Sequence, residues 1–367
     1  MDIDITNPYN DTVQYGVTYS LISPTNLPED VTIAESSLSK SSATGSIEAN
    51  ETKSISLVIV NNSTESLTVS FSVINGYKNG GELIVGTEKL IEDVYNIVPL
   101  SLITLMNLGL DDDIQTDTPD FSKVSYSTCD TSTDTTCEAT VGIYSMKDDL
   151  GTSYYFRGDV ENNYVYFANS YWRIIRINGD GSVRMIYDGT SAHTNGEESE
   201  DRIVASMDYA LYSRYNDNTY VGYMYGTAGV TGTGEDGYNQ THSNEHDNTI
   251  KTYLEDTWYP TLSDNDKMKI ADAIYCNDRS LDTSNASYTG IGYTETYYAG
   301  YQRLIRNSIP SPILKCLNKN DRFTYNASIG SVEENNKLEA AVGLITADEV
   351  ILAGASVKAE NKKIIYI

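Results

Sequence analysis

Three histidines are the first residues to consider for metal binding or proton transfer, because imidazole titrates near neutral pH and is a common metal ligand. His242 and His246 lie four residues apart, but the residues between them are polar and loop-like. A zinc pair at this spacing needs a helix that holds both rings on one side. We therefore predict no zinc site. His193 stands alone in the sequence, and we expect it to be exposed.

The segment Asn178–Ser182 (NGDGS) resembles the start of a calcium-binding loop. It lacks the glutamate expected at the twelfth position, so we interpret it as a hairpin turn. The acidic runs Asp111–Asp113 and Glu197–Asp201 could bind calcium weakly, although a solvated charged surface explains them equally well. Weak calcium binding aside, we predict no cofactor and no metal site.

The sequence favours no arrangement for catalysis. Asp348 and Glu349 are adjacent, but neighbours on a helix point in different directions, and Glu349 fits a capping box with Thr346. There is no Gly-x-Ser-x-Gly, no phosphate-binding loop and no His-Glu-x-x-His motif. We predict that the protein is not an enzyme and has no catalytic residues.

Aromatic side chains are the stronger candidates for function. The chain has 30 Tyr against 5 Phe and 2 Trp, and Tyr-rich surfaces suit recognition. Half-exposed strands would explain many of these residues, and most single aromatics should lie in the core. Trp172 and the tyrosines of 209–225 and 288–301 are candidates for a binding surface. The ligand-binding residues that we predict are Tyr220, Tyr223, Tyr225, Tyr238, Trp258 and Tyr297.

The four cysteines permit two disulfides in an exported chain. Cys129 and Cys137 enclose a short polar run, and we expect them to pair. Cys276 and Cys316 would then close a longer loop, stabilising the fold by about 3–4 kcal/mol. The alternative for each cysteine is a free buried thiol. The absence of a Cys-x-x-Cys spacing disfavours a metal site.

Charge and hydropathy limit partner and location. Lys and Arg total 25, Asp and Glu total 52, and the net charge is −27. This charge repels phosphate backbones, so we expect no nucleic acid partner. The first residues lack the basic start and apolar core of a signal peptide, and the longest apolar run, Ile97–Leu108, is too short to span a bilayer. We expect a soluble protein or, preferably, a piece of an exported protein without its export and anchor segments.

The strongest strand signal lies in Tyr154–Asp188, which is dense in β-branched and aromatic residues. Its apolar runs Trp172–Ile177 and Val183–Tyr187 are separated by Asn178–Gly181, and Asn-Gly and Asp-Gly tolerate the positive φ of a tight hairpin. We predict three strands here, forming the sheet core of the larger domain.

The rest of the chain suggests two domains joined by a connector. Residues 1–87 alternate apolar and polar side chains, as in Leu67, Val69, Phe71 and Val73, which predicts an immunoglobulin-like β-sandwich that acts as a stalk. Residues 88–120 should form a connecting helix, bent at Pro99, and an acidic linker. Residues 121–367 should form a larger α+β domain.

Within that larger domain we predict three helices. Asp247 or Asn248 should cap a helix over Thr249–Tyr259, and Ser263 should cap one over Asp264–Tyr275. The capping box at Thr346 should begin a short helix that Gly354 ends.

Several motifs of this domain also occur together elsewhere. YYFRGDVENNYVYFANSYWRIIRINGDGSVRMIYD, NTIKTYLEDTWY, IYCNDRS and AVGLITADEVILAG lie in this order over roughly residues 138–355. This stretch resembles a signature of uncharacterised cell-surface proteins of gut Firmicutes. The resemblance implies a secreted or wall-associated protein, and Cys276 and Cys316 match the family's cysteine positions.

The same family typically continues with a Trp-Trp-Thr-Met-Ser-Pro-like strand and an Arg-Pro-Val-Ile-like end, neither of which is present. We therefore expect the domain to be truncated at its C-terminus. Those later motifs are similar to C-type-lectin-like and formylglycine-generating-enzyme-like folds. The resemblance thus implies a C-type-lectin-like α+β domain.

Three hypotheses on function follow. The first is an extracellular binding module or adhesin for a glycan or protein, with the long Tyr-, Gly- and Asn-rich loops as its recognition face. The second is a structural subunit of a surface filament or layer, in which copies of the chain pack together. The third is an enzyme of the formylglycine-generating type, which would need a reactive cysteine.

Overall fold

The computed structural model describes residues 2–8, 10, 12–24, 26, 31–34, 42–56, 58–61, 63, 66–79, 82–193, 199–204, 225, 242–282, 298–326, 335 and 337–355. The chain divides into two compact units. The first comprises residues 1–108 with 179–181, and the second comprises 109–178 with 182–367. Both contain β-sheet, and helices are short, so the fold is mixed α+β.

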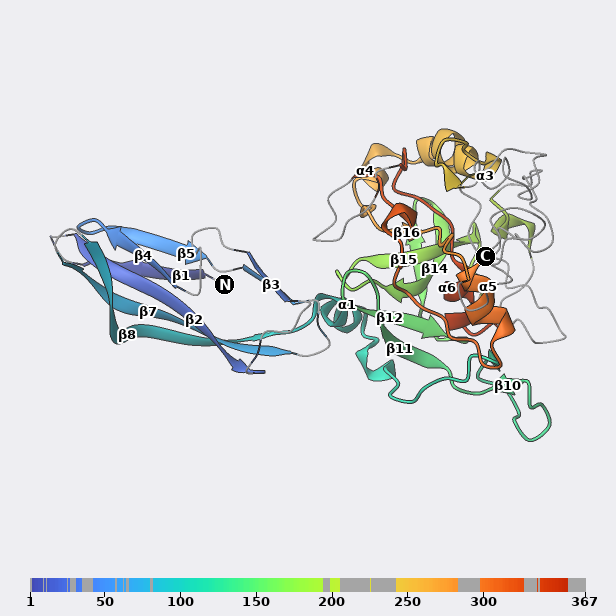
Figure 1. The fold of residues 1–367 in the computed structure, drawn as a ribbon, viewed down its shortest axis with the longest axis horizontal. Helices are drawn as coiled ribbons and strands as arrows, with labels where there is room; N and C mark the ends of the chain where they lie inside the picture. The colour runs from blue at the N-terminus through green and yellow to red at the C-terminus, as the bar shows by residue number, and fades with distance from the viewer. Residues whose placement is uncertain are drawn as a thin grey trace. The chain divides into compact units, whose positions relative to one another are not determined.

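The described residues of the first unit form antiparallel strands and one helix (Figure 1). Its largest sheet has the order β4-β2-β7-β8, formed by Ser42–Ile47, Val13–Ser23, Leu67–Asn79 and Glu82–Ile97. Two smaller pairs accompany it, β1 with β5 and β3 with β6, formed by Asp2–Thr6, Thr52–Ser56, Val31–Ala34 and Val58–Asn61.

Strand β7 provides the core of this unit. Leu67, Val69, Phe71 and Val73 are each 0 % exposed, which confirms that these alternate residues share a buried face. Alternate side chains of a strand project to one side, so the four together bury a continuous apolar row.

The helix expected from residue 88 onwards begins later. Strand β8 continues to Ile97, paired with Leu67 of β7, and helix α1 occupies only Leu100–Leu108. The prediction for 88–97 was wrong because pairing with β7 along the whole strand outweighs a helix-like spacing of apolar residues. Pro99 precedes the helix rather than bending it, and its carbonyl accepts the N–H of Ile103.

The second unit is organised around strand β14 (Ser170–Ile177). The other strands of its five-stranded antiparallel sheet are β11, β12, β13 and β15, formed by Gly142–Lys147, Thr152–Arg157, Tyr164–Phe167 and Val183–Gly189. Strand β14 pairs with β15 along its length, with β13 through residues 170–173, and with β12 through residues 176–177.

The turn between β14 and β15 is the predicted hairpin. Asn178 N–H donates to the carbonyl of Ser182 at 2.8 Å, and Gly181 has a φ of +85°. Residues 154–188 contain parts or all of four strands rather than three, because Tyr164–Phe167 also pairs with β14.

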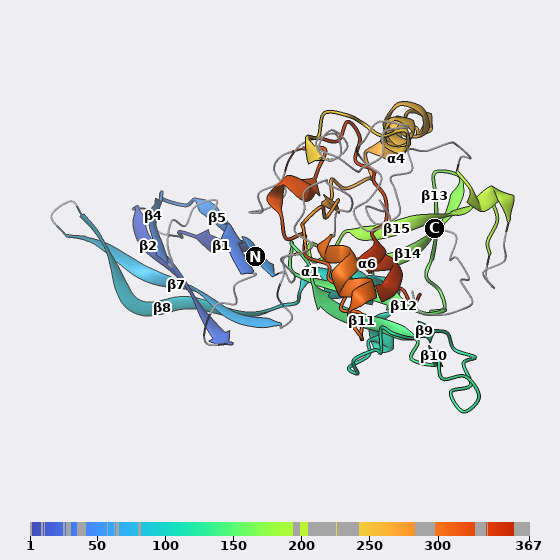
Figure 2. The ribbon, with the colours of Figure 1, turned by 45° about the vertical axis from the view of Figure 1, so that its right-hand side comes forward.

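Helical segments and short strand pairs complete the second unit. The helical segments are η1 (Asp111–Asp113), η2 (Glu200–Arg202), α3 (Thr249–Thr252), η4 (Tyr253–Trp258), η5 (Tyr259–Thr261), α4 (Asp264–Lys267), α5 (Ala299–Tyr301), η6 (Gln302–Arg306), η7 (Lys319–Asp321) and α6 (Ala347–Leu352). The short pairs are β9 (Val124–Ser125) with β10 (Cys137–Glu138), and β16 (Tyr275–Cys276) with β17 (Arg322–Phe323). Helix α6 contacts the helical segment η6 and strand β12 of the sheet (Figure 2).

The predicted helix caps are present. Asn248 accepts from Ile250 N–H, Ser263 accepts from Asp266 N–H, and Thr346 forms the complete capping box with Glu349. The helix after Ser263 ends at Lys267 instead of Tyr275. It is shorter because Tyr275 and Cys276 belong to strand β16, where tertiary pairing replaces local helix formation.

Both expected disulfides are confirmed, Cys129–Cys137 and Cys276–Cys316, so none of the four cysteines is a free thiol. Disulfides are compatible with an oxidising, extracellular compartment. Among the residues described, no helix combines the length and the apolar character that a bilayer crossing requires.

Candidate functional site

Two hollows of the second unit differ in what lines them. The charged cavity, of about 50 Å³, is lined among others by Asp148, Arg176, Arg184, Arg303, Asp348 and Glu349. The aromatic hollow, of about 340 Å³, is lined among others by Trp172, Tyr187, Trp258, Leu262, Ser263 and Asp266. Each takes three residues from the β14–β15 hairpin, so the same hairpin shapes both.

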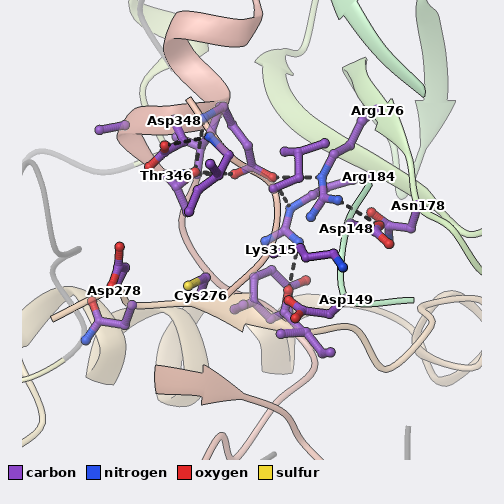
Figure 3. A pocket seen from close by; sticks show the side chains of 18 of the residues that line it. Asp148, Asp149, Arg176, Asn178, Arg184, Cys276, Asp278, Lys315, Thr346 and Asp348 are labelled. Atoms are coloured by element: carbon purple, nitrogen blue, oxygen red, sulfur yellow. Dashed lines mark hydrogen bonds and ion pairs between the residues drawn. The ribbon is translucent and has the colours of Figure 1, made fainter. Parts of the chain in front are cut away.

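The centre of the charged cavity is Glu349 of α6. One oxygen of its carboxylate lies 2.9 Å from Arg176 Nε and 3.1 Å from Arg184 Nε, and all three side chains are buried. The other accepts the Thr346 N–H at 2.9 Å. Figure 3 shows the two arginines reaching from the sheet towards the segment that carries Thr346 and Asp348. The like charges of the arginines are thus held together by one carboxylate.

A second ion-pair set lies at the other side of this cavity. Arg303 of η6 contacts Asp348 at 2.6 Å and Asp278 at 2.7 Å. Asp348 also accepts the backbone N–H of Ile313 at 3.0 Å. Four chain segments that lie far apart in sequence are therefore joined through one guanidinium and one carboxylate.

The pKa values of the two helix carboxyls move in opposite directions. Burial raises the pKa of Asp348, and Arg303 only partly opposes this effect. Burial would also raise the pKa of Glu349, but Arg184 and Arg176 outweigh it and hold that pKa below its usual value. Glu349 is therefore the better stabilised anion of the two.

The chemistry available in the charged cavity is limited by its size and saturation. A volume of about 50 Å³ is room for a few water molecules. The buried side-chain oxygens of Asn178 and Asn277 line it and have no hydrogen-bond partner among the described residues, which suits water. Because its carboxylates are already paired with arginines, we interpret the cavity as a structural connection between the sheet and the helices.

The aromatic hollow is built from the β13–β14 turn, the β14–β15 hairpin and the helical segments around residue 258. Trp258 ends η4, a π-helical turn, and such turns are rare and frequent at functional sites. The β13–β14 turn places Ala168 and Asn169 at φ values of 50° and 60°. Both the π-helical turn and the left-handed alanine are locally unfavourable, and both lie at this hollow.

The rings of the hollow are centred on Trp172. Its ring centroid lies 5.5 Å from that of Tyr187, at 85°, and 5.9 Å from that of Trp258, at 68°. The Trp172 indole N–H donates to the Phe167 carbonyl at 2.9 Å, so its polar atom is satisfied within the hairpin. The rings meet edge to face, which is a favoured aromatic geometry.

Apolar and polar groups both border the rings. Ile203 and Val204 are 49 % and 38 % exposed, so apolar surface at this edge of the hollow is open to solvent. Ser263 and Asp266 add polar groups, with the Ser263 hydroxyl donating to the Asp266 carboxylate at 2.6 Å. A hollow of this size with aromatic walls and a few polar groups has the properties of a small-ligand site.

The predicted aromatic residues lie in different places in the structure. Trp258, and Trp172 beside it, line the hollow. Tyr225 lies in the core instead of on a recognition face: it is 1 % exposed and packs on Phe323 at 5.2 Å, and burial raises the pKa of its hydroxyl. Tyr220, Tyr223, Tyr238 and Tyr297 lie outside the described residues.

Tyr187 and Asp266 are among the lining residues that were not predicted as a binding site. Tyr187 faces Trp172 across the β14–β15 pair; the hairpin signal at 178–181 predicts that the two strands pair, but the register shift that sets these two rings opposite each other has no signal in the sequence. Asp266 lies in the first turn of α4, where a carboxylate is expected for helix capping and so gave no sign of a ligand role.

His193 is buried rather than exposed, and its prediction was wrong. It is 6 % exposed, and its Nε2 lies 2.9 Å from Asp201 Oδ1. The hydroxyl of Ser199 donates to Asp201 and not to the histidine, so the three do not form a charge-relay arrangement. The loop after β15 is closed by Asp201, which also accepts N–H groups of Thr190 and Ser191.

Among the described side chains, no group of three or more His, Cys, Asp and Glu is placed to hold a metal ion. His242 stacks on Tyr298 with centroids 5.9 Å apart.

Comparisons of the chain with protein-family models, with curated proteins and with solved structures find no match.

Proposed function

We propose that the protein is a non-catalytic recognition module on the outside of a bacterial cell, and that it holds part of an extracellular glycan or protein in the aromatic hollow. One observation carries the proposal: Trp172, Tyr187 and Trp258 converge on a hollow whose edge is open to solvent. Trp and Tyr supply a large share of binding energy at recognition sites. A volume of about 340 Å³ falls at the lower end of the range for ligand pockets.

Fold and location belong to the same proposal. An immunoglobulin-like sandwich for the first unit agrees with its antiparallel strands and buried alternate residues, and a C-type-lectin-like domain is our proposal for the second. Exposure at a cell surface or wall agrees with two disulfides. The formylglycine-generating alternative needs a reactive cysteine, and the pairing of all four cysteines weighs against it.

Intrinsic fluorescence provides the test, because the chain has 2 Trp and both line the hollow. Ligands found on glycan and protein arrays should change this fluorescence. We expect Trp258→Ala to weaken array binding at least tenfold, in line with the roughly 2 kcal/mol or more that aromatic hot spots contribute.

The matched control is Tyr166→Ala, which removes a 62 %-exposed ring of the neighbouring strand β13 outside the hollow. It should leave binding unchanged. If Trp258→Ala and Trp258→Phe both bind the array ligands as tightly as wild type, the proposed site is overturned.

A further inference from the structure

The rings of the aromatic hollow are arranged as walls rather than as one stacking platform. Tyr187 stands at 85° to Trp172, and Trp258 at 68°. The C–H face of a sugar ring stacks on one exposed aromatic face, whereas rings at steep angles can border a compact group from several sides. Such aromatic walls are the usual receptor for an alkylammonium cation, which the negative face of each ring attracts.

The charge of the lining has the matching sign. Asp266 is the one charged residue among the described residues that line the hollow, so this part of the lining carries a single negative charge. Its Oδ2 accepts from Ser263, and its Oδ1 is 3.7 Å from the ammonium of Lys269, whose side chain is 58 % exposed. An ion pair this open to water is weak, so the Asp266 Oδ1 is available to a second cation.

No Lys or Arg of the described residues lies over the rings of the hollow. Elsewhere in the described residues, Lys or Arg groups lie over aromatic rings repeatedly, as Arg173 does over Tyr164 at 4.5 Å and Arg184 over Tyr275 at 4.5 Å. Of the cation–ring contacts within the described part of the chain, none uses Trp172, Tyr187 or Trp258. No described Lys or Arg of the chain therefore competes with an outside cation for these rings.

We infer that the aromatic hollow binds an organic cation, an alkylammonium headgroup that the Trp172, Tyr187 and Trp258 rings surround and the Asp266 carboxylate neutralises. The inference rests on the proposed function, because it names the chemical group that enters the same hollow. The net charge of −27 acts in the same direction, since it concentrates cations near the surface.

The experiment is a fluorescence titration of the full chain with choline and with tetramethylammonium, at constant ionic strength. The reference compound is the neutral carbon isostere of choline, in which a tert-butyl group replaces the trimethylammonium group. We expect choline to bind about tenfold or more tightly than this isostere, as expected for a desolvated cation between aromatic rings.

Two carboxylates on one helical turn give the matched pair of variants. Asp266→Asn keeps an acceptor for Ser263 but loses the charge, and should weaken choline binding about five- to tenfold without changing binding of the isostere. Asp264→Asn removes the charge of a side chain that is fully exposed and does not line the hollow. The choline affinity of this variant should equal that of wild type. Lys269→Met removes the competing ammonium and should strengthen choline binding about two- to threefold.

The outcomes separate this inference from the function on which it rests. If the isostere binds as tightly as choline, or if Asp266→Asn and Asp264→Asn behave alike, the hollow does not select a cation and the inference is overturned. If array ligands bind in a Trp258-dependent way while neither choline nor tetramethylammonium competes, the proposed function stands and the inference fails. If nothing binds in a Trp258-dependent way, both fail.

Discussion

The charged cavity and the aromatic hollow are shaped by the same hairpin, yet each receives a different cross-strand pair. Arg176 pairs with Arg184 at the charged cavity, and Trp172 pairs with Tyr187 at the hollow. The arginines are neutralised by Glu349 and Asp148, and little space is left beside them. The rings border a larger volume that the described side chains leave open. Charges that are already paired within the protein indicate a structural role, whereas aromatic rings that border an open volume indicate a ligand site.

Variants of the two regions should therefore differ in the property that they change. Changes at the charged cavity should alter stability and leave ligand binding intact. Changes at the hollow should alter binding and have little effect on stability.

The largest effect should come from Glu349→Gln. It removes the carboxylate that Arg176 and Arg184 share and leaves Asp148, beside Arg176, to balance both buried arginines, which should lower the free energy of unfolding by about 3–5 kcal/mol. Urea denaturation followed by circular dichroism measures the loss. The exposed Glu161→Gln should change stability by less than about 0.5 kcal/mol. Similar midpoints for the two variants would show that the cavity is not structural.

The second largest loss of stability should come from removing the disulfide next to the charged cavity. Replacing Cys276 and Cys316 by Ser releases a loop with a sequence separation of 40, for which chain entropy predicts a loss of about 4 kcal/mol. Replacing Cys129 and Cys137, separated by 8, should lower stability by about 2.5 kcal/mol. Thermal unfolding of both double variants compares them. An equal loss would mean that loop length does not determine their contributions.

Acid should weaken the charged cavity through Glu349. Its pKa is lower in the folded protein than in the unfolded chain, so its contribution is fully present above the unfolded pKa of about 4.3 and is lost as pH falls through the folded value. Stability of the wild type should therefore decline on acidification below about pH 4.3, and that of Glu349→Gln should decline less. Parallel pH profiles would argue against a charged Glu349.

The smallest effect is expected at the rim of the hollow. Ala168 occupies the left-handed region with a φ of 50°, which is unfavourable for a residue with a Cβ. Ala168→Gly should raise the free energy of unfolding by about 0.5–1 kcal/mol, since relief of this strain exceeds the added chain entropy. Asn162→Gly, at a φ of 59°, should gain less because Asn tolerates this region. A loss of stability in Ala168→Gly would show that the turn is unstrained.

Signals that depend on a few neighbouring residues predicted the structure well. The 178–182 turn, the caps at Asn248, Ser263 and Thr346, and the buried row on β7 all follow from local backbone preferences or from alternation within one strand. The candidate site was predicted only in part: Trp172 and Trp258 were named, while Tyr187 and Asp266 were not.

The errors occurred where a distant segment decides the outcome. Residues 88–97 became a strand because β7 pairs with them, and the helix after Ser263 ends early because Tyr275 pairs with Phe323. Tyr225 is buried because Phe323, some hundred residues away in the chain, packs on it. His193 is buried because Asp201 and the β13–β14 region close over its loop.

The sequence by itself determined where the chain turns, where helices begin, which cysteines were free to pair and that the protein is strongly acidic. These properties reside in single residues or short spans. Only the tertiary structure decided which aromatics meet. A register shift between Ile174 and Arg176 sets Tyr187, and not Asp188, opposite Trp172, and the π-helical turn brings Trp258 to the same ring. Register and packing depend on segments far apart in sequence, so local residue preferences do not contain them.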